Sequence, residues 1–183
     1  MVGSSVSLGG KQSSTRRNAL SVLQAYGLDA ASISPVFLDP GEAALALEDS
    51  LIDATFIMGA EPISVLQQLA KRTSIRLLPI EEEHANKIIS DYRYMQQDAI
   101  DAGTYARNAL IRTISLPQAW IINEQADEEL VFDLTRALWL TEGLRDIIPD
   151  ALHDTANLAI AEGNLAFLPV HQGAKHFYLQ NTE

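Results

Sequence analysis

Residues 1–100 alternate short apolar runs with stretches whose apolar residues recur at helical spacing. The apolar runs predict strands, and the periodic stretches between them predict helices. Strands are expected near Val6 and at Val36–Leu38, Ala54–Met58 and Ile75–Leu78, with helices at Arg16–Tyr26, Glu42–Ser50, from Pro62 onward and at Glu81–Met95. Connections that contain a helix join parallel strands. The sequence therefore predicts an α/β fold with a parallel-rich sheet flanked by helices.

The rest of the chain follows a different pattern. Two strands are expected at 109–116 and 118–123, separated by Pro117. Helices are then expected at Asp127–Leu144 and Pro149–Ala161, followed by a short terminal element around Pro169–Leu179. A chain of 183 residues is long enough for one domain or two small lobes.

Composition excludes several classes of function. The formal net charge is -11, from 13 basic and 24 acidic residues, which argues against a general nucleic-acid binder because such proteins need a basic face. Cysteine is absent, which excludes disulfides, thiolate catalysis and sulfur-ligated metal. No run approaches the ~20 apolar residues that span a bilayer. The opening residues MVGSSVSLGG do not have the pattern of a signal peptide.

The segment VSLGGKQSSTRRNA at residues 6–19 predicts a strand, a glycine loop and a helix start rich in hydroxyls. Ser13, Ser14 and Thr15 lie where the helix begins, and unpaired N–H groups at such an end favour a carboxylate or phosphate. The alternative is that these residues only cap the helix. Arg16 either supplies local positive charge or is a solvated residue of the first turn. Both interpretations stay open at this point.

Three further residues are candidates for ligand contact. Met58 and Gly59 follow an expected buried strand, and ligands of open α/β sheets bind beyond the carboxyl ends of strands. Gly59 also suits a turn. Tyr105 could stack on or hydrogen-bond a ligand, or it could belong to the core.

Residue spacing does not indicate catalysis, a metal site or a cofactor. The four histidines have no metal-ligand spacing, and His171 is expected to brace the terminal loop. The chain has neither the G-x-S-x-G pattern nor a P-loop. The acidic groups Glu81–Glu83 and Glu128–Glu129 stand at helix starts, where carboxylates are stabilised by the helix dipole. We therefore expect a protein that is not an enzyme and needs no cofactor.

Five segments, in order along the chain, resemble the TAXI-type solute receptors of TRAP transporters. They are VSLGGKQSSTRRNAL at 6–20, IDATFIMGAEP at 52–62, IRLLPI at 75–80, GTY at 103–105 and HQGAKHFY at 171–178. The family carries glycine at the position of Ser14, and Pro-Gly-Gln at the position of residues 106–108.

The resemblance implies a type II periplasmic-binding-protein fold. Residues 1–100 would form the second α/β lobe, and residues 101–183 the crossover and the returning C-terminal part of the first lobe. The resemblance also implies a small carboxylate ligand, such as an amino acid or dicarboxylate. It further implies that the partner is a TRAP membrane permease and that the location is periplasmic. Two alternatives on the same fold are a ligand-sensing domain and an interaction domain that completes itself as a homo-oligomer.

Overall fold

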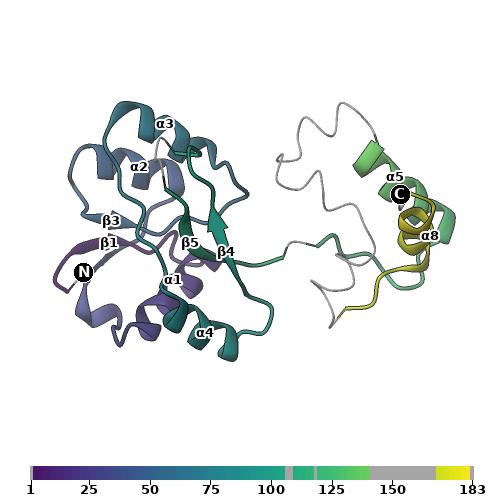
Figure 1. The fold of residues 1–183 in the computed structure, drawn as a ribbon, viewed down its shortest axis with the longest axis horizontal. Coiled ribbons are helices and arrows are strands. Elements are labelled where there is room, and N and C mark those ends of the chain that lie inside the picture. Colours follow the sequence, from purple (N-terminus) through teal and green to yellow (C-terminus); the bar gives the residue numbers. More distant parts are fainter. Residues whose placement is uncertain (1, 106–108, 118, 141–167, 182–183) are drawn as a thin grey trace. The chain divides into compact units, whose positions relative to one another are not determined.

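The computed structural model describes residues 2–105, 109–117, 119–140 and 168–181 (Figure 1). The chain divides into two compact units, Met1–Ser115 and Leu116–Glu183. Among these described residues, the first unit holds a parallel sheet, a separate hairpin-like pair of strands and four α-helices, and the second unit holds two helices.

A three-stranded parallel sheet organises the first unit, in the order β2-β1-β3. The strands are β1 (Ser5–Ser7), β2 (Ser34–Val36) and β3 (Ala54–Thr55). Val6 lies opposite Pro35 on one side and Ala54 on the other. Pro35 is tolerated because β2 is an edge strand. Helices α1 (Ser14–Ala25) and α2 (Pro40–Glu48) connect the strands. The expected parallel α/β sheet is thereby confirmed.

The core of this unit lies between β1 and α1. Val6 and Leu8 are 0% and 1% exposed, and they pack with Ala19 and Leu23 from the inward face of α1. Partly buried apolar side chains surround this cluster, among them Phe37 and Phe56. Burial of this apolar stripe holds α1 across the sheet, which fixes the position of its N-terminal end.

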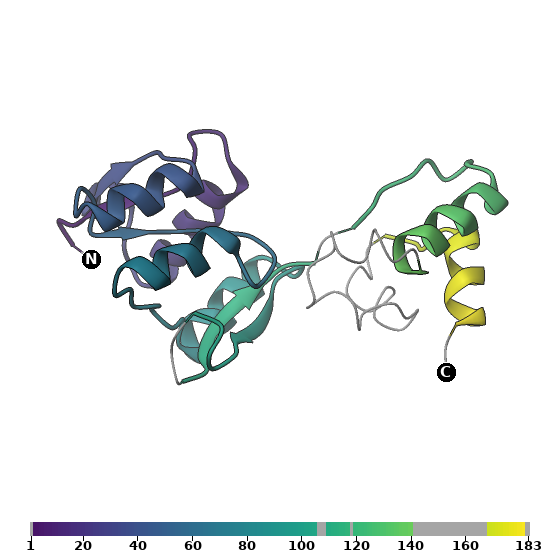
Figure 2. The same ribbon diagram turned by 90° about the horizontal axis from the view of Figure 1, so that it is seen from above.

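Four more elements complete the first unit. They are α3 (Ser64–Arg72), α4 (Glu82–Asp91), β4 (Gln96–Ile100) and β5 (Ile111–Ser115), with a 3₁₀ turn at Ala30–Ser32 before β2. Strands β4 and β5 pair antiparallel, from Gln96 opposite Ser115 to Ile100 opposite Ile111. Helix α3 packs on α2, and α4 packs on α1 (Figures 1 and 2).

Two sequence predictions in this unit were wrong. Ile75–Leu78 is not a strand, although Ile80 N–H, just beyond it, donates to the carbonyl of Arg112 at 3.0 Å. The helix expected to reach Met95 ends at Asp91, because the chain turns at Tyr92–Met95 and enters β4. Strands β2 and β3 form close to their expected positions but are shorter, so Phe37 and Phe56–Met58 lie beyond the ladder.

The second unit is built on α5 (Glu128–Leu140) and α8 (Gln172–Gln180), which pack against each other. Phe177 is 1% exposed, and its ring meets Phe132 edge-on at 6.0 Å. His171 Nδ1 accepts from Gly173 N–H at 3.2 Å, so His171 caps α8. Residues 119–123 are not a strand, contrary to expectation. The helix expected at Pro149–Ala161 lies outside the described residues, as does the end of the helix expected to reach Leu144.

Candidate functional site

The loop between β1 and α1 is folded tightly onto the start of the helix. Gly9 has φ +84°, a conformation that L side chains rarely adopt. A Cβ at Gly9 would lie 2.7 Å from Thr15 Cβ and 2.9 Å from Ser13 Oγ. The loop therefore needs glycine at this position both for its backbone and for its contact with the helix.

Ser13 is the N-cap of α1. Its Oγ accepts from the N–H of Arg16 at 3.2 Å and donates to the carbonyl of Gly10 at 2.8 Å. Ser14 is the exposed first residue of the helix, and Thr15 is half-buried. In the described part of the chain, no acceptor takes the N–H of Ser14 or Thr15, as expected for a first helical turn. The cap thus uses Ser13 and leaves two backbone donors available.

Arg16 bridges the loop and the segment that follows β2. Its Nη1 donates to the carbonyl of Lys11 at 2.8 Å, and its guanidinium carbon lies 4.9 Å from the centre of the Phe37 ring. Its Nε is buried without a partner. Arg16 therefore holds the loop in place and keeps one positive charge next to the helix start.

Met58 meets α1 from the end of β3. The Nδ2 of Asn18 donates to Met58 Sδ at 3.0 Å, and both residues are half-buried. Because the carboxyl ends of β1, β2 and β3 share one edge of the parallel sheet, this edge gathers Gly9, Phe37 and Met58. The sequence prediction did not include Asn18. Its spacing of four positions from Ser14 was the available signal, since such residues share a helix face.

Tyr105 and Gly59 belong to the surroundings of α3. The Tyr105 hydroxyl accepts from the N–H of Ile63, the N-cap residue of α3, at 2.7 Å, and the side chain is 4% exposed. Burial raises the pKa of Tyr105 above its ordinary value of 10.0. A Cβ at Gly59 would lie 3.1 Å from Cγ1 of Ile63. The described contacts of Tyr105 are thus with the start of α3 and do not include the start of α1.

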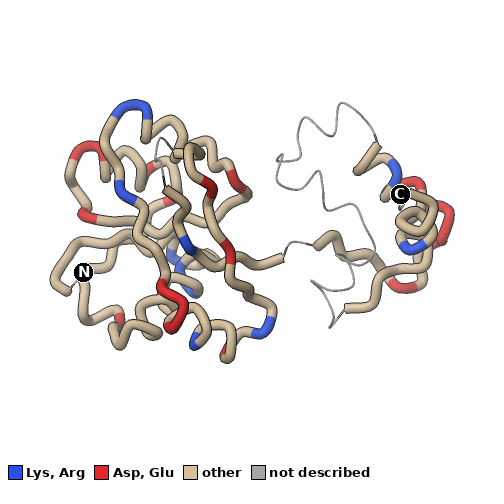
Figure 3. Tube along the Cα trace, in the orientation of Figure 1, with Lys and Arg blue, Asp and Glu red and all other residues tan. Residues whose placement is uncertain are grey.

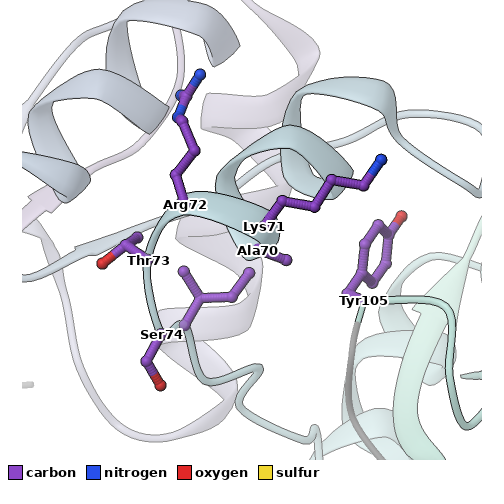
Figure 4. A pocket seen from close by; sticks show the side chains of 7 residues that line it. Ala70, Lys71, Arg72, Thr73, Ser74 and Tyr105 are labelled. Atoms are coloured by element: carbon purple, nitrogen blue, oxygen red, sulfur yellow. The ribbon is translucent and has the colours of Figure 1, made fainter.

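An open pocket of about 430 Å³ lies beside Tyr105. Figure 4 shows Lys71 and Tyr105 on one side of it and Arg72 directed away from Tyr105. Arg72 pairs with Glu48 at 2.9 Å. The lining residues are Ala70, Lys71, Arg72, Thr73, Ser74, Ile75 and Tyr105.

The charge near the start of α1 has both signs. Asp39, the N-cap residue of α2, has its carboxylate beside the loop, because a Cβ added at Gly10 would be 3.1 Å from Asp39 Oδ1. Arg16, in the first turn of α1, carries the positive charge. Along the described trace, basic and acidic positions are interspersed with no continuous basic stripe (Figure 3). Within the same described ranges, no group of three or more histidine or acidic residues could hold a metal ion.

The helices among the described residues include none that is both long and apolar enough to cross a membrane.

Comparison with known families gives a match to the NMT1-like family over residues 1–180. This family is periplasmic-binding-protein-like, consists of binding proteins rather than enzymes, and is usually periplasmic or extracellular. The match covers almost the whole chain and agrees with the parallel α/β sheet that carries the candidate site. The chain belongs to the NMT1-like family.

Proposed function

We propose that this chain is the solute-binding component of a TRAP-type transporter and binds a small organic anion at the start of α1. The observation that carries the proposal is the pair of available N–H groups on Ser14 and Thr15. They lie at the carboxyl edge of a parallel sheet, in a family of binding proteins.

The local geometry supports an anion rather than a cation or an apolar ligand. A helix start carries a partial positive charge, and the hydroxyls of Ser14 and Thr15 add donors. Arg16 contributes a full charge one residue further on. Because the net charge of -11 gives no long-range attraction for an anion, affinity rests on these short-range donors. Met58 and Gly59 form the neighbouring part of the proposed site, and we keep Tyr105 as a more distant member.

The proposal extends to the whole receptor. Residues 1–100 serve as one α/β lobe, and residues 101–183 as the crossover and the returning part of the other lobe. Closure of two lobes on a bound solute is the usual hinge motion of periplasmic binding proteins. The closed form is what a TRAP membrane permease would recognise in the periplasm. The family membership supports a transporter partner in general terms.

The test replaces Ser14 by proline. Proline is well tolerated as the first residue of a helix, and the backbone of Ser13, with φ -79° and ψ 155°, suits a residue that precedes proline. Ser14→Pro therefore removes one N–H and one hydroxyl while keeping α1. Ser64→Pro is the matched control, because Ser64 is the exposed first residue of α3.

The readout is isothermal titration calorimetry with succinate and L-glutamate as probes. We expect Ser14→Pro to weaken binding by about tenfold or more, as for loss of a charge-assisted hydrogen bond, and Ser64→Pro to leave it unchanged. Equal affinity of Ser14→Pro and the unaltered protein for both probes would show that the start of α1 is not part of the binding site.

A specific observation favours self-association as a second candidate function. Trp120 and Ile121 are 78% and 84% exposed in the second unit, an unusual amount of apolar surface for two adjacent residues. Sedimentation equilibrium across a range of concentrations tests this candidate. A Trp120→Ser variant should shift the equilibrium towards monomer if these residues form the contact, and a concentration-independent monomer would exclude it.

A further inference from the structure

Residues 119–122 lie in the second unit and belong to neither a helix nor a strand. The side chains of Trp120, Ile121 and Ile122 are 78%, 84% and 39% exposed. Within the described part of the chain, no hydrogen bond reaches the backbone of these four residues. The segment thus presents unpaired backbone groups together with apolar side chains, the combination by which a segment can pair with another chain.

The residue types of this segment favour a strand that is covered on both faces. Residues 119–122 have the sequence AWII, and tryptophan and isoleucine are enriched in strands. An apolar run without polar alternation is typical of a strand buried on both sides. Residues 119–123 nevertheless form no strand, because a strand needs a backbone partner and the described residues supply none. The segment therefore lacks only a second strand.

A second copy of the same segment meets this need. Residues 113–123 contain no charged residue, so two copies can pair without bringing like charges together, although each chain carries a net charge of -11. Two-fold symmetry restricts an antiparallel pair to registers in which one residue lies opposite itself. With Ile121 in that position, Trp120 of each copy lies opposite Ile122 of the other, so every large apolar side chain has an apolar partner.

The exposed surface determines how strong such a pair can be. The three side chains present roughly 400 Å² per chain, or about 800 Å² in two copies, and the paired backbone adds to this area. Stable interfaces bury about 1,200 Å² or more in total. We therefore expect a reversible dimer that forms at roughly micromolar concentrations.

We infer that residues 119–123 dimerise this protein by antiparallel strand pairing with a second copy, centred on Ile121; this rests on the self-association proposed above. Ala119 lies opposite Asn123 at each end of the pair. The ladder ends there, because the carbonyl of Asn123 accepts from the N–H of Ala126 at 2.9 Å and the chain turns. On the other side, Pro117 has no N–H to donate.

Cysteine cross-linking tests the register directly, since the chain contains no cysteine. Ile121→Cys places two thiols opposite each other, and we expect oxidation to give a disulfide-linked dimer on a non-reducing gel. Ala119→Cys alone is the control, because two copies of this residue are about 14 Å apart along the ladder. An equimolar mixture of Ala119→Cys and Asn123→Cys should cross-link.

Charge substitutions test the same register at equilibrium. Ile121→Asp and Ile121→Lys each place like charges opposite each other and lose an apolar pair, so we expect either to weaken dimerisation at least tenfold in sedimentation equilibrium. A mixture of the two variants pairs a carboxylate with an ammonium group and should recover a mixed dimer. Leu179→Asp, at a position of α8 that is 64% exposed, should leave the dissociation constant unchanged.

Three outcomes would overturn the inference. A dimer without Ile121→Cys cross-linking would show that the chain associates through another surface. Efficient cross-linking of Ala119→Cys alone would show that the encounter has no fixed register. A monomer in which Trp120 resists acrylamide quenching, with Trp120→Ser as the reference, would show that the chain itself covers the segment. Succinate calorimetry on Ile121→Asp tests the anion site separately, because solute binding can persist in a monomer.

Discussion

At Gly173, the structure and helix propensity predict opposite effects of an alanine substitution on stability. It is the second residue of α8, and replacing glycine by alanine inside a helix usually stabilises it by about 1 kcal/mol. In this structure, however, a Cβ at Gly173 would clash with the carbonyl oxygen of Glu128 and lie 2.9 Å from the backbone nitrogen of Phe132. The neighbouring atoms belong to the backbone of α5 and cannot rotate away.

The expected cost follows from the shift that is needed. Restoring ordinary contact requires α5 and α8 to separate by roughly 1 Å, which weakens the dispersion contacts between them. The buried Phe177 and its edge contact with Phe132 lie in the same interface. Overpacking of this kind costs about 1–3 kcal/mol. We therefore expect Gly173→Ala to lower the stability of the second unit despite its better helix propensity.

Gly41→Ala provides the matched control. Gly41 is the second residue of α2, which is also nine residues long, and no atom lies within 4 Å of its would-be Cβ. Urea unfolding is followed by circular dichroism for both variants and by tryptophan fluorescence for the second unit, which contains both tryptophans. Gly41→Ala should be neutral or stabilising. A Gly173→Ala midpoint equal to or above that of the unaltered protein would refute the close packing of α8 on α5.

Two further predictions concern the first unit. Tyr105→Phe removes the acceptor of the Ile63 N–H and should lower the free energy of unfolding by about 1–3 kcal/mol, and an unchanged urea midpoint would contradict this role. The Tyr26 hydroxyl donates to the carboxylate of Glu81, and this hydrogen bond is the main reason why the pKa of Glu81 lies below its ordinary value of 4.5. Stability from this bond is present above pH 4.5 and is lost as the pH falls through the lower pKa of the folded state. Urea midpoints of Tyr26→Phe should therefore depend less on acid than those of the unaltered protein, and parallel pH profiles would show that the bond has no effect.

The candidate site was partly predictable because its signals are local. A glycine loop followed by Ser13 at the start of a periodic stretch indicates a capped helix after a strand, and the structure has that cap. The proximity of Met58 follows from parallel connectivity, since strand ends share an edge. The partners were not predictable. Met58 lies 40 positions from Asn18, and Tyr105 lies 42 from Ile63.

Strand assignment shows the same division between local and long-range information. Gln96–Ile100 has the sequence QQDAI, without the apolar alternation that signals a strand, yet it forms β4. The segment forms a strand because its backbone hydrogen-bonds with that of β5 over five residue pairs. Ile75–Leu78 is apolar and was expected to be a strand, but it takes no place in the parallel sheet.

The sequence by itself determined the alternation of strands and helices from β1 to α3, the parallel sheet and the capped helix start near Ser13. These depend on apolar periodicity and capping residues, which act within a few positions of one another. Tertiary structure decided which backbone edges pair, where Arg16, Asn18 and Tyr105 find their partners, and why Gly173 must be glycine. Each of these depends on atoms from distant parts of the chain, and no local pattern records where such atoms come together.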